Sequence, residues 1–150
     1  MWFGKVKADL AEIPNALDWF ENEYTQAKLE VRINGSVEKQ SRDLPGIVEH
    51  RFAQLQELEA ILEHLNIQLN KVRTKSFRQY LEAYNRALTS RDAEKFADGE
   101  EDVIMYQELV NEVALMRNKW QGIIKTLDIK GFQINNVIRL KIAGQEDFRL

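Results

Sequence analysis

Apolar residues recur every seven positions along two long stretches of the chain. In the first stretch the pattern has two rows, offset by three positions: Leu55, Leu62 and Leu69, and Leu58, Leu65 and Val72. Rows with this spacing occupy the a and d positions of a coiled-coil seam. They predict one long amphipathic helix over residues 45–88, for which Asp43 and Pro45 provide a suitable N-terminus.

The second stretch covers residues 100–129. It repeats the pattern with the rows Tyr106, Val113, Trp120 and Leu127, and Leu109, Met116 and Ile123. It predicts a second long helix that Gly131 ends, with Phe132 packed back on it and a short helix over residues 134–143. The two seams can pair as an antiparallel hairpin within one chain or between chains, and heptad spacing does not choose between these pairings.

The remaining segments predict shorter elements. Residues 1–13 form a leader with an apolar tip and space for one short helix. Residues 14–33 form a helix that ends at Asn34 and Gly35, and residues 91–97 form a helix capped by Ser90. Residues 36–43 are a loop or an exposed continuation of helix, and the tail from residue 144 is expected to be loose.

These elements predict an all-α fold. The chain has only seven glycines and two prolines in 150 residues, and so few breaks favour long helices. We expect one domain over residues 1–150, made of a leader and loop (1–44), a long seam and basic helix (45–89) and a C-terminal helical part (90–150).

The long seam predicts assembly. Its apolar strip exceeds what one short leader helix can cover, and a strip of that length left in water favours association of several chains. We therefore expect a homo-oligomer, built as a helical bundle or barrel. The residues expected to hold its subunits together are Leu55, Leu58, Leu62, Leu65, Leu69 and Val72.

Composition argues against several classes of chemistry. The chain has no Cys, which excludes disulfides and thiolate sites and fits a cytoplasmic protein. No apolar run is long enough for a membrane span, and the N-terminus lacks the apolar core of a secretory signal.

His50, Glu57 and His64 share one helical phase but stand about 10 Å apart along a helix, too far to share a metal ion. No phosphate loop or nucleophile motif is present, so we expect neither an enzyme nor a cofactor.

The net charge of −3 hides a strongly basic segment. Residues 71–80 contain Lys71, Arg73, Lys75 and Arg78 and no acid. Lys71, Lys75 and Arg78 follow one helical stripe at positions i, i+4 and i+7, whereas Arg73 lies on another face. Like charges at such spacing cost about 0.2–0.5 kcal/mol per pair, and a bound polyanion would offset that cost.

Aromatic residues accompany the basic segment. Phe77, Tyr80 and Tyr84 offer faces on which unpaired bases stack, or they pack in the core, which we favour for Phe77. Lys125 and Lys130 form a second, weaker basic surface. The residues expected to bind nucleic acid are therefore Lys71, Arg73, Lys75, Arg78, Tyr80, Lys125 and Lys130.

The segment LNKVRTKSFRQYLEAY resembles the central motif of the UvsY-type phage recombination mediators, Lys-Val-x-x-Lys-x-Arg-Leu-x-Tyr-Tyr. Four positions coincide: Lys71, Val72, Lys75 and Tyr80. Phe77 stands where the motif has Arg, and Leu81 stands where it has the second Tyr. The family's glycine-rich linker after the motif is replaced by NRALTSRD.

A second segment, IKGFQINNVIRLKIAG, is similar to the closing element of the same family. That element has a basic residue followed by Gly-Phe-x-Ile and then an amphipathic stretch that reaches a final Gly. The matching positions are Lys130, Gly131, Phe132, Ile134 and Gly144. The two matches and the interval between them cover roughly half the chain, and the first third is not clearly matched.

The resemblance implies an all-helical protein that assembles into a ring-like homo-oligomer, heptameric in the family, and binds single-stranded DNA without sequence preference. It also implies contacts with a phage recombinase and with the phage single-stranded-DNA-binding protein, because such a mediator loads the recombinase onto strands that the binding protein coats. Its location would be the cytoplasm of the infected host cell. The alternative, which needs the seams but not the basic segment, is a non-enzymatic coiled-coil structural or adaptor protein.

Overall fold

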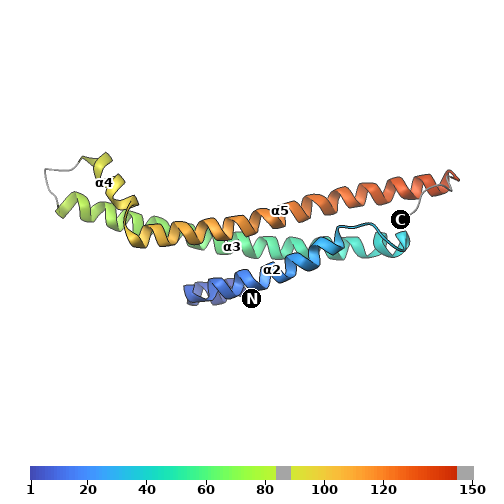
Figure 1. The fold of residues 1–150 in the computed structure, drawn as a ribbon, viewed down its shortest axis with the longest axis horizontal. Coiled ribbons are helices and arrows are strands. Elements are labelled where there is room, and N and C mark those ends of the chain that lie inside the picture. Colours follow the sequence, from blue (N-terminus) through green and yellow to red (C-terminus); the bar gives the residue numbers. More distant parts are fainter. Residues whose placement is uncertain (84–88, 145–150) are drawn as a thin grey trace. The chain divides into compact units, whose positions relative to one another are not determined.

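The computed structural model describes residues 1–83 and 89–144 (Figure 1). Every regular element in these ranges is helical. The elements are α1 (Trp2–Ala8), a 3₁₀ turn (Leu10–Glu12), α2 (Ile13–Glu30), α3 (Val37–Ala83), α4 (Ser90–Asp98) and α5 (Glu101–Ile142). The all-α prediction is therefore confirmed. The expectations for Tyr84, for the end of the long helix near residue 88 and for the tail after Gly144 lie outside the described residues.

The long helix α3 begins eight positions before the predicted start at Pro45. Ser36 precedes its first turn, and the Ser36 hydroxyl accepts a hydrogen bond from the backbone N–H of Lys39 at 3.3 Å. Pro45 lies inside the helix, where it removes one backbone donor and leaves the carbonyl of exposed Ser41 to water. The prediction of a helix start at Pro45 was wrong. The alternative of a helical continuation over residues 36–43 is confirmed from Val37 onward.

The helix α5 continues through Gly131 to Ile142, so the predicted end at residue 129 was wrong. The seam itself continues at the same spacing, from Leu127 to Ile134, and both of these residues are buried. Apolar burial on one face outweighs the poor helix propensity of a single glycine. Phe132 does not pack back on the helix, because its side chain is 70% exposed.

This continuity predicts that Gly131→Ala stabilises the protein. A Cβ at Gly131 would lie 3.5 Å from Leu44 Cδ2, an ordinary van der Waals contact. Alanine in a helix interior is favoured over glycine, so we expect the free energy of unfolding to rise by about 0.5–1 kcal/mol. Urea unfolding followed by circular dichroism measures the change. Gly122→Ala is the matched control, because nothing lies within 4 Å of its Cβ position. A loss at Gly131 beside a gain at Gly122 would indicate a helix end at Gly131.

The chain forms two compact units. The first contains Met1–Ile13 and Leu58–Leu115. Here α1 packs on α3, with the rings of Phe3 and His64 edge to face at 6.5 Å. The guanidinium of Arg73 on α3 contacts Gln107 on α5 at 3.5 Å, and the Tyr80 hydroxyl hydrogen-bonds Glu100, just before α5. Within this unit α3 and α5 are therefore antiparallel.

The second unit contains Pro14–Glu57 and the chain from Met116 onward. Its core combines α2, the first part of α3 and the last part of α5. Trp120 on α5 is fully buried, with its ring edge to face with Phe20 of α2 at 5.5 Å. Ala27, Ile123 and Leu127 form an adjoining apolar cluster.

The leucine seam of α3 is covered within the single chain. Leu55, Leu58, Leu62, Leu65 and Leu69 are each at most 8% exposed, and Val72 is half-buried. The sequence argument for assembly assumed that only a short leader helix could cover the seam, whereas in each unit α5 also packs on α3. The seam therefore gives no reason to expect a second chain.

None of the helices in the described part of the chain combines the length and the apolar character that crossing a membrane requires.

Candidate nucleic-acid interface

The C-terminal part of α3 carries an exposed basic surface, formed by Lys71, Lys75 and Arg78. All three side chains are exposed, and none forms an ion pair with another described residue. They line a shallow hollow of about 730 Å³ whose lining residues all belong to α3. Glu82, four positions after Arg78, is the acid among those residues. The three basic residues that the spacing predicted to share a face therefore line one hollow. The hollow has three basic residues and one acid, so its charged groups are mostly positive.

Arg73 lies on a different face of α3, as predicted, but there it has an acidic partner. Its Nε atom lies 2.9 Å from Asp98 Oδ1 at the end of α4, and its guanidinium donates to Gln107 Oε1 at 3.5 Å. The Arg73 side chain is 38% exposed. A phosphate would have to compete with the Asp98 carboxylate for this guanidinium.

Tyr80 is also engaged in packing. Its hydroxyl donates to the carboxylate of Glu100, and its ring stacks on Phe96 of α4 with centroids 5.4 Å apart and planes at 24°. Phe77 is half-buried and lines a small hollow with Arg73, Thr74 and three residues of α4. Both aromatic residues therefore face α4 in the first unit, and the ring of Tyr80 already stacks on a protein side chain.

The predicted second basic surface is not formed. Lys125 is exposed on α5, whereas Lys130 is 5% exposed and its Nζ atom donates to the backbone carbonyl of Glu30 at 2.6 Å. Burial lowers the pKa of Lys130, and the carboxylate of Glu30 partly offsets that effect. The Lys130 ammonium therefore caps the C-terminal end of α2 and does not face a ligand.

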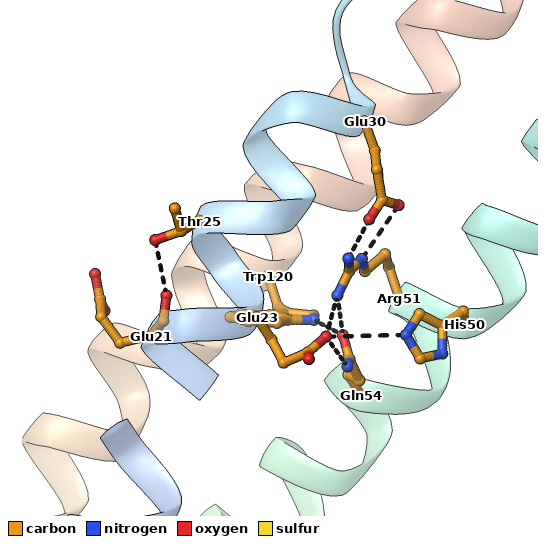
Figure 2. Close-up of polar contacts among 8 residues, drawn as sticks. All are labelled: Glu21, Glu23, Thr25, Glu30, His50, Arg51, Gln54 and Trp120. Atoms are coloured by element: carbon orange, nitrogen blue, oxygen red, sulfur yellow. Dashed lines mark hydrogen bonds and ion pairs between the residues drawn. The ribbon is translucent and has the colours of Figure 1, made fainter. Parts of the chain in front are cut away.

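A buried polar cluster in the second unit was not predicted (Figure 2). At its centre is Arg51 of α3, which is 3% exposed. Its Nη1 donates to Glu23 Oε2 at 2.7 Å and to Gln54 Oε1 at 2.9 Å. Its other nitrogens donate to the two carboxylate oxygens of Glu30. Both acids belong to α2, so Arg51 joins α2 to α3.

Hydrogen bonds extend this cluster to α5. Trp120 Nε1 donates to Gln54 Oε1 at 3.2 Å, and Gln54 Nε2 donates to Glu23 Oε2 at 3.0 Å. The bond from Gln54 is the main cause that lowers the pKa of Glu23, with Arg51 adding to it against the opposing effect of burial. Burial alone would lower the pKa of Arg51, but its bonds to Glu30 and Glu23 outweigh burial and raise it. The cluster is a satisfied structural network.

The heptad spacing could have identified Arg51 and Lys130 as buried residues. Arg51 stands seven positions before Leu58, and Lys130 stands seven positions after Ile123. Both are therefore seam positions, and seam positions face a partner helix. The spacing could have predicted their burial, although not the carboxylates and carbonyl that satisfy them.

The histidines lie apart in the structure. His50 is exposed, with Nε2 3.9 Å from Glu23 Oε2, and His64 packs against Phe3. Within residues 1–83 and 89–144, no group of three or more acidic or histidine side chains could hold a metal ion.

Comparison of the chain with protein-family models, with curated proteins and with solved structures found no match. The likeness to the UvsY-type mediators therefore rests on the two sequence motifs alone.

Proposed function

We propose that this chain binds single-stranded DNA through the phosphate backbone, and that it serves as a recombination mediator. The observation that carries the proposal is the exposed stripe of Lys71, Lys75 and Arg78, whose charges have no carboxylate partner among the described residues. Three such cations on one helix face repel one another. A ligand with a row of phosphates would relieve that repulsion and release its own counterions.

The kind of binding follows from the groups that are available. Lysine and arginine contacts to phosphate position a strand but carry no sequence information. Arg73 and Tyr80 are held by Asp98 and Glu100, so we assign them to packing that orients the stripe. The proposed binding residues are therefore Lys71, Lys75 and Arg78, and exposed Lys125 is a separate, weaker contact.

The likeness to the UvsY-type mediators supplies the rest of the proposal. A mediator of that kind would contact a phage recombinase and the phage single-stranded-DNA-binding protein, and it would load the recombinase onto strands coated by that protein. The binding step is the part that the basic stripe supports, so it is the part to test first.

The test is a fluorescence anisotropy titration with a labelled single-stranded oligonucleotide at 50 and 200 mM salt. Three phosphate contacts give a slope of about −2 in log K against log salt, so affinity should fall about 20-fold between these concentrations. Replacing Lys71, Lys75 and Arg78 together with alanine should weaken binding on the order of 10²–10³-fold at 50 mM salt and remove most of the slope.

The matched control replaces three other exposed basic residues, Lys39, Arg42 and Arg91. It changes the net charge equally and should leave affinity within about threefold, because charges away from the bound strand are screened. No binding at low salt, binding that ignores salt, or an equal loss in the control would contradict the proposal.

The second candidate function is that of a structural or adaptor protein without enzymatic activity. One observation favours it: large apolar side chains remain exposed on the described helices, among them Phe52 at 48% and Phe132 at 70%. On this alternative the triple replacement in the basic stripe would leave function unchanged.

A further inference from the structure

A hollow of about 370 Å³ lies where the end of α2 meets the start of α3. All of its lining residues belong to the second unit. Arg32 and Asn34 line it from the connecting turn, Lys39 and Asp43 from the first turns of α3, and Lys130 from α5. Ligand pockets begin at about 300 Å³, so this hollow has room for one small molecule.

The amide of Gln40 indicates that the hollow binds something. The Gln40 side chain lines the hollow, and its Oε1 and Nε2 atoms are both buried without a hydrogen-bond partner among the described residues. Buried polar groups in native proteins are almost always bonded, and an exception needs an explanation. Glutamine has a long, flexible side chain, and its rotation would turn the amide toward a molecule in the hollow. A ligand there would supply the missing bonds.

The charges around the hollow favour an anion. Arg32 and Lys39 are exposed, and neither forms an ion pair with another described residue. The carboxylate of Glu30, which also lines the hollow, is already bonded within the buried polar cluster. Lys130 is buried and keeps its bond to the Glu30 carbonyl, so its positive charge stays in the wall of the hollow. Asp43 is therefore the acid that faces these cations without an ion pair among the described residues.

The same groups also require a hydrogen-bond donor on the ligand. Gln40 Nε2 donates, but Gln40 Oε1 and the ionised Asp43 carboxylate can only accept. The ligand must therefore combine charged oxygens with a hydroxyl. Inorganic phosphate has this combination, because a P–OH group remains on the anion at neutral pH. Sulfate has the charge but no hydroxyl, and the phosphodiesters within a DNA strand have no P–OH group either.

We propose that this hollow is a binding site for inorganic phosphate, between the end of α2 and the start of α3. The charged oxygens of the phosphate accept hydrogen bonds from Arg32, Lys39 and Gln40 Nε2. Its P–OH group donates to Gln40 Oε1, and in the dihydrogen form the second hydroxyl donates to Asp43. The site shares no residue with the basic stripe on α3, so it does not depend on DNA binding.

The first test compares three anions by isothermal titration calorimetry at pH 8 and constant ionic strength. Inorganic phosphate, sulfate and thymidine 5′-phosphate then carry a charge of about −2 each, and only inorganic phosphate keeps a P–OH group. A site that bonds a hydroxyl rejects an analogue without it, so sulfate and thymidine 5′-phosphate should each bind at least about tenfold more weakly. Equal binding of the three anions, or no binding of phosphate, overturns the proposal.

The second test replaces the amide. Gln40→Leu keeps the approximate size of the side chain and removes both polar atoms, so it should weaken phosphate binding at least about tenfold and abolish the preference over sulfate. The melting temperature without phosphate should stay the same or rise, because an unpaired buried amide is replaced by an apolar group. A variant that is at least as stable as the wild-type chain and still prefers phosphate would contradict the role of Gln40.

A third comparison tests the charges. Lys39→Gln should weaken the binding of both phosphate and sulfate about fivefold or more, because a charged hydrogen bond is lost. The matched control is Arg42→Gln, which removes an exposed charge from the same helix and lies outside the hollow, so binding should stay within about twofold. Equal losses in the two variants would show general attraction of anions and overturn the proposal.

One further variant separates this site from the proposed DNA interface. The chain with Lys71, Lys75 and Arg78 replaced by alanine should bind phosphate like the wild-type chain, and it should show the same rise in melting temperature with added phosphate. Loss of phosphate binding in that variant would place the phosphate on the basic stripe and overturn the proposal. Failure of the wild-type chain to bind DNA would leave the expected phosphate result unchanged.

Discussion

We expect Arg51→Ala to lower the free energy of unfolding by about 3 kcal/mol, the lower end of the range for breaking a buried ion pair. The change leaves Glu23 and Glu30 without the guanidinium that their carboxylates contact, while their side chains are only 28% and 25% exposed. That remaining exposure is why we expect the lower end. Urea unfolding followed by circular dichroism at pH 7 measures the loss.

Two further variants test whether the loss in Arg51→Ala comes from the carboxylates that it leaves unpaired. Arg42→Ala removes an exposed arginine from the same helix and should change stability by at most about 0.5 kcal/mol. The triple variant Arg51→Met, Glu23→Gln and Glu30→Gln removes the charges together and should recover most of the loss, because no uncompensated carboxylate remains. A loss in Arg51→Ala no larger than that in Arg42→Ala would show that Arg51 does not join α2 to α3.

The pH dependence of stability provides another measurement on the same cluster. The pKa of Glu23 is lowered in the folded chain, so Glu23 stabilises the fold above its ordinary pKa of about 4.3. That contribution is lost as the pH falls through the lower, folded pKa. In Arg51→Ala the pKa of Glu23 should rise only in part, because the bond from Gln54, the main cause of the lowered pKa, remains. Stability should therefore decline somewhat less between pH 5 and acid than in the wild-type chain.

The second large effect is expected at Trp120. Its side chain is fully buried, lies against Phe20 and Tyr24 and donates to Gln54. Trp120→Ala should lower the free energy of unfolding by about 3–5 kcal/mol, because it leaves a large cavity among α2, α3 and α5. The measurement is again urea unfolding by circular dichroism, since replacing Trp120 changes the fluorescence itself.

Trp120→Phe distinguishes ring packing from the hydrogen bond. It keeps an aromatic ring, and Gln54 Oε1 retains the bond from Arg51, so its cost should be clearly smaller than that of the alanine variant. Trp19→Ala is a useful control, because Trp19 is 37% exposed although its ring also contacts Phe20. Equal losses at Trp19 and Trp120 would contradict the central position of Trp120 in this core.

Heptad spacing predicted much of the fold, and single residues predicted its boundaries poorly. The rows through Leu58 and Trp120 identified helix faces that the structure buries, because burial of a repeated apolar stripe is an energetic contribution summed over many turns. Pro45 and Gly131 suggested helix ends, but each represents only one unfavourable local interaction. Packing on both sides of each position outweighs that cost, so α3 and α5 continue through them.

The sequence predicted the part of the candidate site that a single helix, α3, places on one face. Lys71, Lys75 and Arg78 share a face because of helix geometry alone, and that face is open. Arg73, Tyr80 and Lys130 were also expected to meet a ligand, but contacts with Asp98, Glu100 and the Glu30 carbonyl engage them instead. These partners lie 20–100 residues away, and spacing along one helix contains no information about them.

The cap that Lys130 provides for α2 also sets an order for folding during synthesis. Glu30 and Lys130 are 100 residues apart, a separation that a ribosome covers in about 5–20 s. Arg51 follows Glu30 by only 21 residues, so α2 can be joined to α3 early in that interval. Until α5 emerges, however, the end of α2 and the space for Trp120 stay open to water. The nascent chain therefore exposes an uncapped, partly apolar helix pair for several seconds, and a chaperone that binds such surfaces would meet it there.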